Sequence, residues 1–153
     1  MTRLLKPALL VLVVALIAAQ FFRPDRTAAP IDPSQVMTAS VAVPAPVDAL
    51  LHRACYDCHS NETRWPWYTQ VAPVSWILAK HVRDGRDELN FSVWGSYQPR
   101  RQAHKLTEIC DQVTAGSMPL RAYTFLHREA SLSPADVEAL CTWAKTAAAT
   151  ITP

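Results

Sequence analysis

An all-α fold is the class that this sequence predicts, and three observations support it. Glycine occurs only three times in 153 residues, which is unusually low for a sandwich or a barrel with many tight turns. Several stretches rich in alanine and leucine repeat apolar residues at the spacing of an amphipathic helix. No two alternating apolar runs are joined by a short turn sequence, so there is no β-hairpin signal.

The first 23 residues are the most apolar part of the chain. Between residues 4 and 22 only Lys6 and Gln20 are polar. A helix of this length spans about 28 Å, close to the thickness of a bilayer core. Residues 1–23 are therefore expected to form a transmembrane anchor, with Arg3 and Lys6 on the cytoplasmic side. A cleaved signal peptide is the alternative for this segment.

Residues 24–47 are expected to form a linker. Five prolines among alanine, serine, threonine and valine disfavour a helix and favour extended chain. We expect a semi-rigid spacer that holds the following domain away from the membrane.

Residues 48–150 are assigned to one helical domain. From Asp48 to the C-terminus the chain carries eleven Lys/Arg and eleven Asp/Glu, so its formal charges balance. A nucleic-acid-binding face needs an excess of basic residues that neutralise phosphates, and we therefore expect no nucleic-acid partner.

Four helices are expected in this domain. The first begins near Pro46, which suits a first helical turn, and runs into Cys55. The second covers residues 74–89 and the third residues 99–115. The third carries a clear amphipathic stripe made of Leu106, Ile109, Cys110 and Val113.

The fourth helix has the strongest start signal. Ser133 can cap it, Pro134 suits its first position, and Asp136 follows three residues after the cap. Its apolar face consists of Val137, Leu140, Cys141 and Ala144.

Residues 55–59 read Cys-Tyr-Asp-Cys-His, the C-x-x-C-H pattern of covalent haem attachment. Two thiols at this spacing can each bond one vinyl group on the same edge of a porphyrin. A histidine directly after them can reach the iron. The pattern predicts Cys55 and Cys58 as haem-binding residues and His59 as an iron ligand.

A redox pair, a zinc site and a structural disulfide each fit the C-x-x-C-H pattern less well. A thioredoxin-like redox pair follows a strand, and no strand is expected before Cys55. A structural zinc site needs four ligands, and the chain has no second C-x-x-C or spaced pair of histidines. A disulfide between the two cysteines leaves His59 without a role.

Met118 is the expected sixth ligand of the iron. It lies in a Gly-Ser-Met-Pro loop between the third and fourth helices, and a thioether is a soft ligand that raises the reduction potential of haem. The alternatives are four histidines, of which the first is the strongest: His127, His81, His104 and His52. A tryptophan- and tyrosine-rich stretch at residues 65–68, with Trp76 and Trp94, is expected to wall the haem; ordinary core packing is the alternative.

Residues 55–76, with the sequence CYDCHSNETRWPWYTQVAPVSW, resemble the small haem-binding domain family of bacterial exported c-type cytochromes. Residues 89–97, LNFSVWGSY, and residues 118–120, Met-Pro-Leu, resemble it too. The resemblance extends over nearly the whole chain. It implies an all-helical domain similar to class I cytochromes c, with one haem c bonded to Cys55 and Cys58.

The same resemblance implies roles for single residues. His59 corresponds to the proximal ligand, and Met118 occupies the family's Met-Pro position. By analogy with class I cytochromes, the carbonyl of Pro73 is the expected acceptor for the second ring nitrogen of His59. The family has no well-defined physiological reaction, so it implies no substrate.

Two functions of different classes fit these features. The first is a membrane-anchored electron carrier that serves redox partner proteins, lies at the cell inner membrane and exposes its haem domain to the periplasm. The second is a haem-based sensor or peroxidase-like protein with a labile sixth ligand. Peroxide cleavage needs a distal arginine or histidine, for which Arg121 is a weak candidate, so we expect no enzymatic activity.

Cys110 and Cys141 lie outside the family pattern and form an even pair in an oxidising compartment. Each lies on the apolar stripe of its helix, so packing of the two stripes would bring the thiols together. We expect a disulfide here; two buried free thiols are the alternative.

Overall fold

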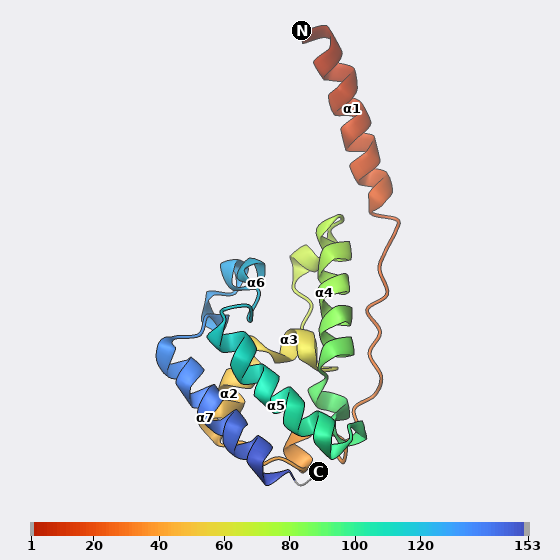
Figure 1. The fold of residues 1–153 in the computed structure, drawn as a ribbon. Helices are drawn as coiled ribbons and strands as arrows, with labels where there is room; N and C mark the ends of the chain where they lie inside the picture. Colours follow the sequence, from red (N-terminus) through yellow and green to blue (C-terminus); the bar gives the residue numbers. More distant parts are fainter. Residues whose placement is uncertain (1, 152–153) are drawn as a thin grey trace.

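The computed structural model describes residues 2–151, and every regular element in this range is helical (Figure 1). The α-helices are α1 (Thr2–Ala19), α2 (Ala45–Ala54), α3 (Tyr56–His59), α4 (Val74–Glu88), α5 (Pro99–Thr114), α6 (Arg121–Leu126) and α7 (Pro134–Thr150). The 3₁₀ helices are η1 (Met37–Ala39), η2 (Trp67–Gln70), η3 (Phe91–Ser96) and η4 (Arg128–Ala130). The expected all-α class is confirmed.

The start of α7 shows how local sequence determines a helix boundary. The Ser133 hydroxyl accepts a hydrogen bond from the Asp136 backbone N–H at 3.2 Å, and the Asp136 carboxylate accepts one from the Ser133 N–H at 2.8 Å. This reciprocal capping box satisfies two backbone donors that the helix leaves without partners. Pro134 occupies the first helical position, so the expected start of this helix is confirmed.

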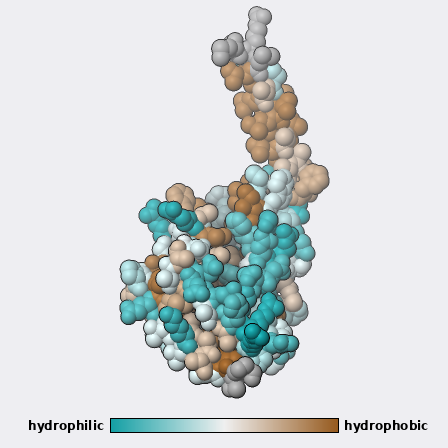
Figure 2. Space-filling model, viewed as in Figure 1, coloured by the Kyte–Doolittle hydropathy of each residue, from teal (hydrophilic) through white to brown (hydrophobic). Residues whose placement is uncertain are grey.

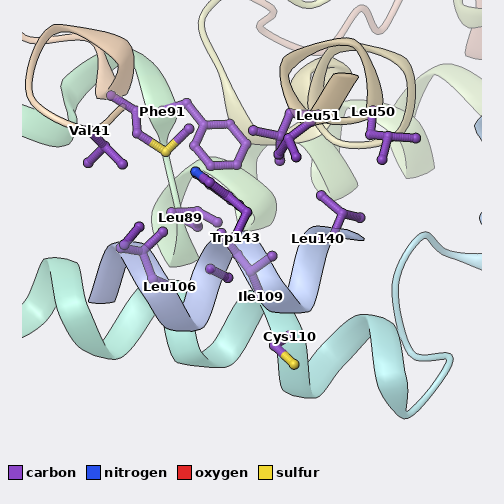
Figure 3. Packing of buried hydrophobic residues seen from close by; sticks show 14 of the residues in the cluster. Val41, Leu50, Leu51, Leu89, Phe91, Leu106, Ile109, Cys110, Leu140 and Trp143 are labelled. Carbon is purple, nitrogen blue, oxygen red and sulfur yellow. The ribbon is translucent and has the colours of Figure 1, made fainter. Parts of the chain in front are cut away.

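The hydrophobic core lies where α5 and α7 run along each other and α2 meets α7 (Figures 1 and 3). Burial of apolar surface at this junction supplies most of the stabilisation that a small domain has. The most deeply buried apolar residues are Met37, Leu51, Phe91, Trp94, Leu106, Leu140 and Ala144.

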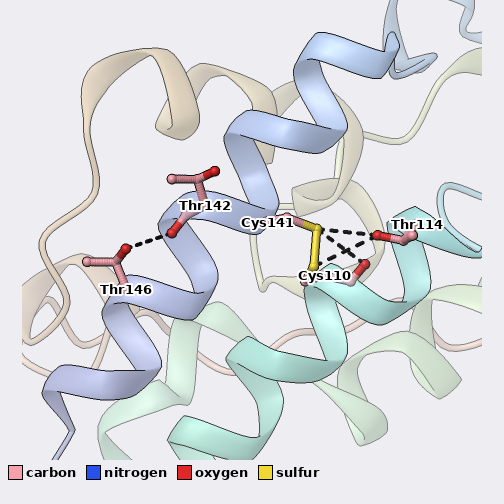
Figure 4. Close-up of a disulfide and its surroundings, with 5 residues drawn as sticks. All are labelled: Cys110, Thr114, Cys141, Thr142 and Thr146. Carbon is pink, nitrogen blue, oxygen red and sulfur yellow. Dashed lines mark hydrogen bonds between the residues drawn. A yellow bond between two sulfur atoms is a disulfide. The ribbon is translucent and has the colours of Figure 1, made fainter.

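A disulfide joins the two central helices. Cys110 of α5 and Cys141 of α7 are bonded, and their Cα atoms lie 4.6 Å apart (Figure 4). The Thr114 hydroxyl lies 3.4 Å from the Cys141 sulfur. The expected disulfide between the two apolar stripes is therefore confirmed.

Loss of this bridge should be costly to stability. Replacing Cys110 and Cys141 together by alanine should lower the free energy of unfolding by about 3–4 kcal/mol, because the bridge closes a loop of roughly 30 residues in the unfolded chain. Urea denaturation of the variant and of the oxidised protein measures the difference. Wild-type protein treated with a thiol reductant should show a similar loss, and equal stability in all three samples would contradict the prediction.

The expected transmembrane anchor over residues 1–23 is not supported by the structure. Within the described residues, no helix combines the length and apolarity needed to cross a bilayer. The helix α1 ends at Ala19 after 18 residues, which gives a length of about 27 Å, and it contains Lys6 and Pro7 near its start. From Leu5 onward its apolar side chains are exposed, as the brown surface in Figure 2 shows.

The segment expected to be a spacer, residues 24–47, runs along the domain instead of standing away from it. The Asn61 side-chain amide donates to the Ala29 carbonyl at 3.0 Å, and the Gly95 N–H donates to the Gln35 carbonyl at 2.9 Å. Met37, at the start of η1, is fully buried in the core. Proline content predicts the absence of long helix in this segment but not its attachment to the domain surface.

Candidate functional site

The C-x-x-C-H residues form a sharp turn between two helices. The helix α2 ends at Ala54, Cys55 has φ −124°, and the short helix α3 follows at once. The His59 N–H donates to the Cys55 carbonyl at 3.0 Å, which closes the turn. Neither Cys55 nor Cys58 takes part in a disulfide. Burial raises the pKa of Cys55 to about 12 and that of Cys58 to about 11, so both thiols stay protonated at neutral pH.

The orientation of His59 is set by the end of α4. Its Nδ1 lies 2.9 Å from the Gly85 carbonyl oxygen and 3.0 Å from the Leu89 carbonyl oxygen, so Nδ1–H donates to both. This assignment leaves Nε2 as the unprotonated, metal-binding nitrogen. Burial lowers the pKa of His59, which favours the neutral imidazole that a metal requires.

The expectation that Pro73 accepts the His59 proton is wrong. The Pro73 carbonyl instead accepts backbone N–H bonds from Trp76 at 3.1 Å and Ile77 at 3.4 Å, within the first turn of α4. The Gly85 carbonyl accepts the Leu89 N–H at 2.9 Å and the His59 proton on its second lone pair, and the Leu89 carbonyl lies directly after the last residue of α4. The acceptors of His59 therefore come from the C-terminal end of α4.

Gly85 allows α4 to approach the attachment turn. A Cβ atom at this position would lie 2.7 Å from the Cys58 carbonyl oxygen, closer than real Cβ contacts permit. Only glycine fits without a shift of backbone. This role was not predicted from the sequence, although an isolated glycine inside a helical pattern is a signal of close packing.

One cavity collects most of the predicted ligands. Cys55, His59 and Met118 all lie on its wall. The apolar part of the wall comes from α2, α5 and the residues around η3, namely Ala54, Leu89, Phe91, Ile109 and Val113.

A second cavity is lined by the other cysteine of the attachment turn. Cys58 lines it, together with apolar side chains of α4 and α6, the aromatic Tyr68 and Tyr123, and His81. The two cysteines of the turn therefore line different cavities, Cys55 the first and Cys58 the second.

The structure distinguishes Met118 from the rival histidines. His127 has both ring nitrogens engaged, Nε2 with the Tyr68 hydroxyl and Nδ1 with the Glu129 carboxylate at 3.2 Å. His52 and His104 are exposed on α2 and α5 and do not line either cavity. The remaining alternative ligand, His81, lies on the wall of the second cavity and forms no hydrogen bond within the described residues.

The aromatic residues take different roles. Trp65 and Tyr68 line the second cavity. Trp94 is buried in the core, and the Trp76 indole N–H donates to the Phe22 carbonyl at 2.6 Å. Trp67 is 79% exposed. Aromatic character alone does not predict which of these positions faces a cavity.

Asp57, between the two cysteines, organises one wall of the second cavity. Its carboxylate accepts hydrogen bonds from the Tyr123 hydroxyl at 2.7 Å and from the Arg64 guanidinium at 3.2 Å. Burial, together with this bond, raises the pKa of Tyr123, so its hydroxyl remains a donor. Tyr123 also stacks on His127, with ring centroids 4.4 Å apart. No local pattern pairs Asp57 with Tyr123, which is 66 residues away.

An all-helical domain whose cysteine and histidine turn opens onto apolar cavities has the fold and donor set of a haem-binding protein. A comparison with protein families supports this class, because the model of a haem-binding domain family matches residues 14–146. The match covers most of the chain, so the chain belongs to the haem-binding domain family. No curated protein and no solved structure matches the chain significantly.

Proposed function

We propose that this chain is an exported c-type cytochrome that carries one haem and transfers electrons to and from partner proteins. Cys55 and Cys58 would hold the haem as thioethers, His59 would bind the iron from one side and Met118 from the other. The observation that carries the proposal is the presence of Cys55, His59 and Met118 on the wall of one cavity. Haem itself supplies a one-electron couple at its iron.

The walls of the two cavities fit a haem. The two thiols that would bond the porphyrin each line one of the cavities, Cys55 the first and Cys58 the second. Apolar side chains on the second cavity are unusually exposed, with Ile77 at 53% and Leu126 at 55%. A flat apolar macrocycle would cover them and remove this surface from water.

The protein residues have three tasks in electron transfer. The two carbonyls at the end of α4 hold the His59 ring and keep Nε2 unprotonated. The apolar walls keep water away from the iron, and Met118 favours the ferrous state. None of these tasks needs a proton donor near the iron, which is why we favour electron transfer over peroxide chemistry.

We also propose that the domain works outside the cytoplasm, at the periplasmic side of the inner membrane. The Cys110–Cys141 disulfide supports an oxidising compartment. The basic residues before the apolar N-terminal run support export of the following chain, as an anchor or as a signal peptide.

Replacing Met118 by alanine tests the ligand assignment. The haem should stay covalently attached, but the sixth position should open, so carbon monoxide should bind the reduced variant readily. The reduction potential should fall, because the thioether that favours ferrous iron is gone. Visible spectra and a redox titration measure both effects.

His127→Ala is the matched control, because both nitrogens of this imidazole already have partners. It should keep the wild-type spectrum, because the ligands of the iron are unchanged. An unchanged potential in Met118→Ala would show that another residue is the sixth ligand, and His81→Ala would be the next variant. Fast carbon monoxide binding by the wild-type protein would instead favour a sensor with a labile sixth ligand.

A further inference from the structure

We propose that Lys105, acting through Glu88, is a positioning residue that controls how His59 is held. This inference rests on the proposed function, because His59 needs exact orientation only as an iron ligand. The three residues lie on different elements and line the same cavity.

Lys105 is a buried cation on an apolar stripe. It lies on α5 next to Leu106, and its side chain is only 9% exposed. Its ammonium group contacts the Glu88 carboxylate of α4 and lies 2.7 Å from the Glu108 carboxylate of its own helix. A lysine is seldom buried unless it is paired, so the two carboxylates explain why the charge is tolerated here.

Of these two ion pairs, only the one to Glu88 joins different helices. Glu88 is the last residue of α4, and it stands between Gly85 and Leu89, whose carbonyls accept the His59 Nδ1–H. The pair with Lys105 therefore ties the end of α4 that holds His59 to α5. The Lys105–Glu108 pair lies within one helix and has no such effect on α4.

This tie has a defined consequence for the haem iron. The stronger the hydrogen bonds from Nδ1–H, the more basic the imidazole becomes, and a more basic ligand favours ferric iron. If the end of α4 becomes mobile, these bonds weaken and the reduction potential rises. The loss of the Lys105 charge by itself has the opposite effect on the reduction potential. Removal of a cation near the iron stabilises ferric iron and lowers the potential.

Because the two effects shift the reduction potential in opposite directions, the variant Lys105→Met distinguishes them. We expect its potential to rise and its His59 Nδ1–H to exchange with solvent at least tenfold faster than in the wild type, as followed by proton NMR of the reduced protein. Lys105→Arg, which keeps the charge and the pair, should restore wild-type values. Glu88→Gln changes a largely exposed side chain that should not prevent folding, and it should also speed the exchange.

Two controls separate this tie from general effects. Lys80→Met removes another ion pair of α4, with Asp84, from a side chain that is 64% exposed. Glu108→Gln removes the second partner of Lys105 without touching α4. Both should keep the wild-type exchange rate of the His59 proton.

The outcomes are distinguishable. A protein without covalent haem, seen by intact mass, would overturn the proposed function itself. A haem-loaded Lys105→Met whose potential falls and whose proton exchanges at the wild-type rate would overturn the positioning role alone. An equally fast exchange of the His59 proton in Glu108→Gln would also overturn the positioning role. It would show that the structure around Lys105 has loosened in general, and not that the ion pair to α4 has been lost.

Discussion

Replacing Cys55 and Cys58 together by alanine is expected to abolish covalently bound haem. In the proposed function each cysteine would supply one thioether, and the structure offers neither thiol a substitute, since the other two cysteines are joined to each other. Intact mass after export with the maturation machinery should show the added mass of one haem in the wild type and none in the double variant. Each single variant should retain one bond.

The chain provides a matched control for this experiment. Cys110→Ala with Cys141→Ala also removes two cysteines, but these residues line neither cavity. This variant should lose stability and keep its haem. Covalent haem in the protein without Cys55 and Cys58, or its loss from the control alone, would contradict the assignment of the attachment site.

Replacing Gly85 by alanine is expected to have the second-largest effect, a loss of both stability and bound haem. In Gly85→Ala the new Cβ would lie 2.7 Å from the Cys58 carbonyl oxygen, so α4 has to move away from the attachment turn. Overpacking of this kind costs about 1–3 kcal/mol of folding free energy. The displaced helix also takes the Gly85 carbonyl away from His59, so the fraction of protein that carries haem should fall.

Gly116→Ala is a useful comparison for Gly85→Ala. Gly116 has φ 65°, a conformation that favours glycine, but nothing lies within 4 Å of its would-be Cβ. Alanine there should cost backbone strain without disturbing the contact between α3 and α4. Urea denaturation and the ratio of haem absorbance to protein absorbance measure both effects. Equal haem loading in Gly85→Ala and the wild type would show that the close approach is not needed.

Local signals in the sequence predicted the helices well. The start of α7 follows from Ser133, Pro134 and Asp136 alone, because a capping box uses residues three positions apart. The stripes of α5 and α7 placed Cys110 and Cys141 on facing sides, so their disulfide could be predicted too. The short helix α6 was missed, since its six residues bury no side chain and show no stripe.

The candidate site depends on contacts that local patterns do not contain. The spacing within residues 55–59 predicts which side chains take part in haem binding. It does not identify Gly85 and Leu89 as the acceptors of His59, because these lie 26 and 30 residues away and act through backbone carbonyls. Any residue type carries such a carbonyl, so only the arrangement of α3 against α4 reveals it.

The position of the disulfide has a consequence for how the protein is assembled. Four cysteines allow three ways of forming two disulfides, and a wrong pairing would consume the thiols that a cofactor needs. The Cys110–Cys141 bond lies between α5 and α7, and neither of its cysteines lines either cavity, whereas Cys55 and Cys58 do. Because Cys110 and Cys141 are bonded to each other, both thiols of the attachment turn remain free for a cofactor.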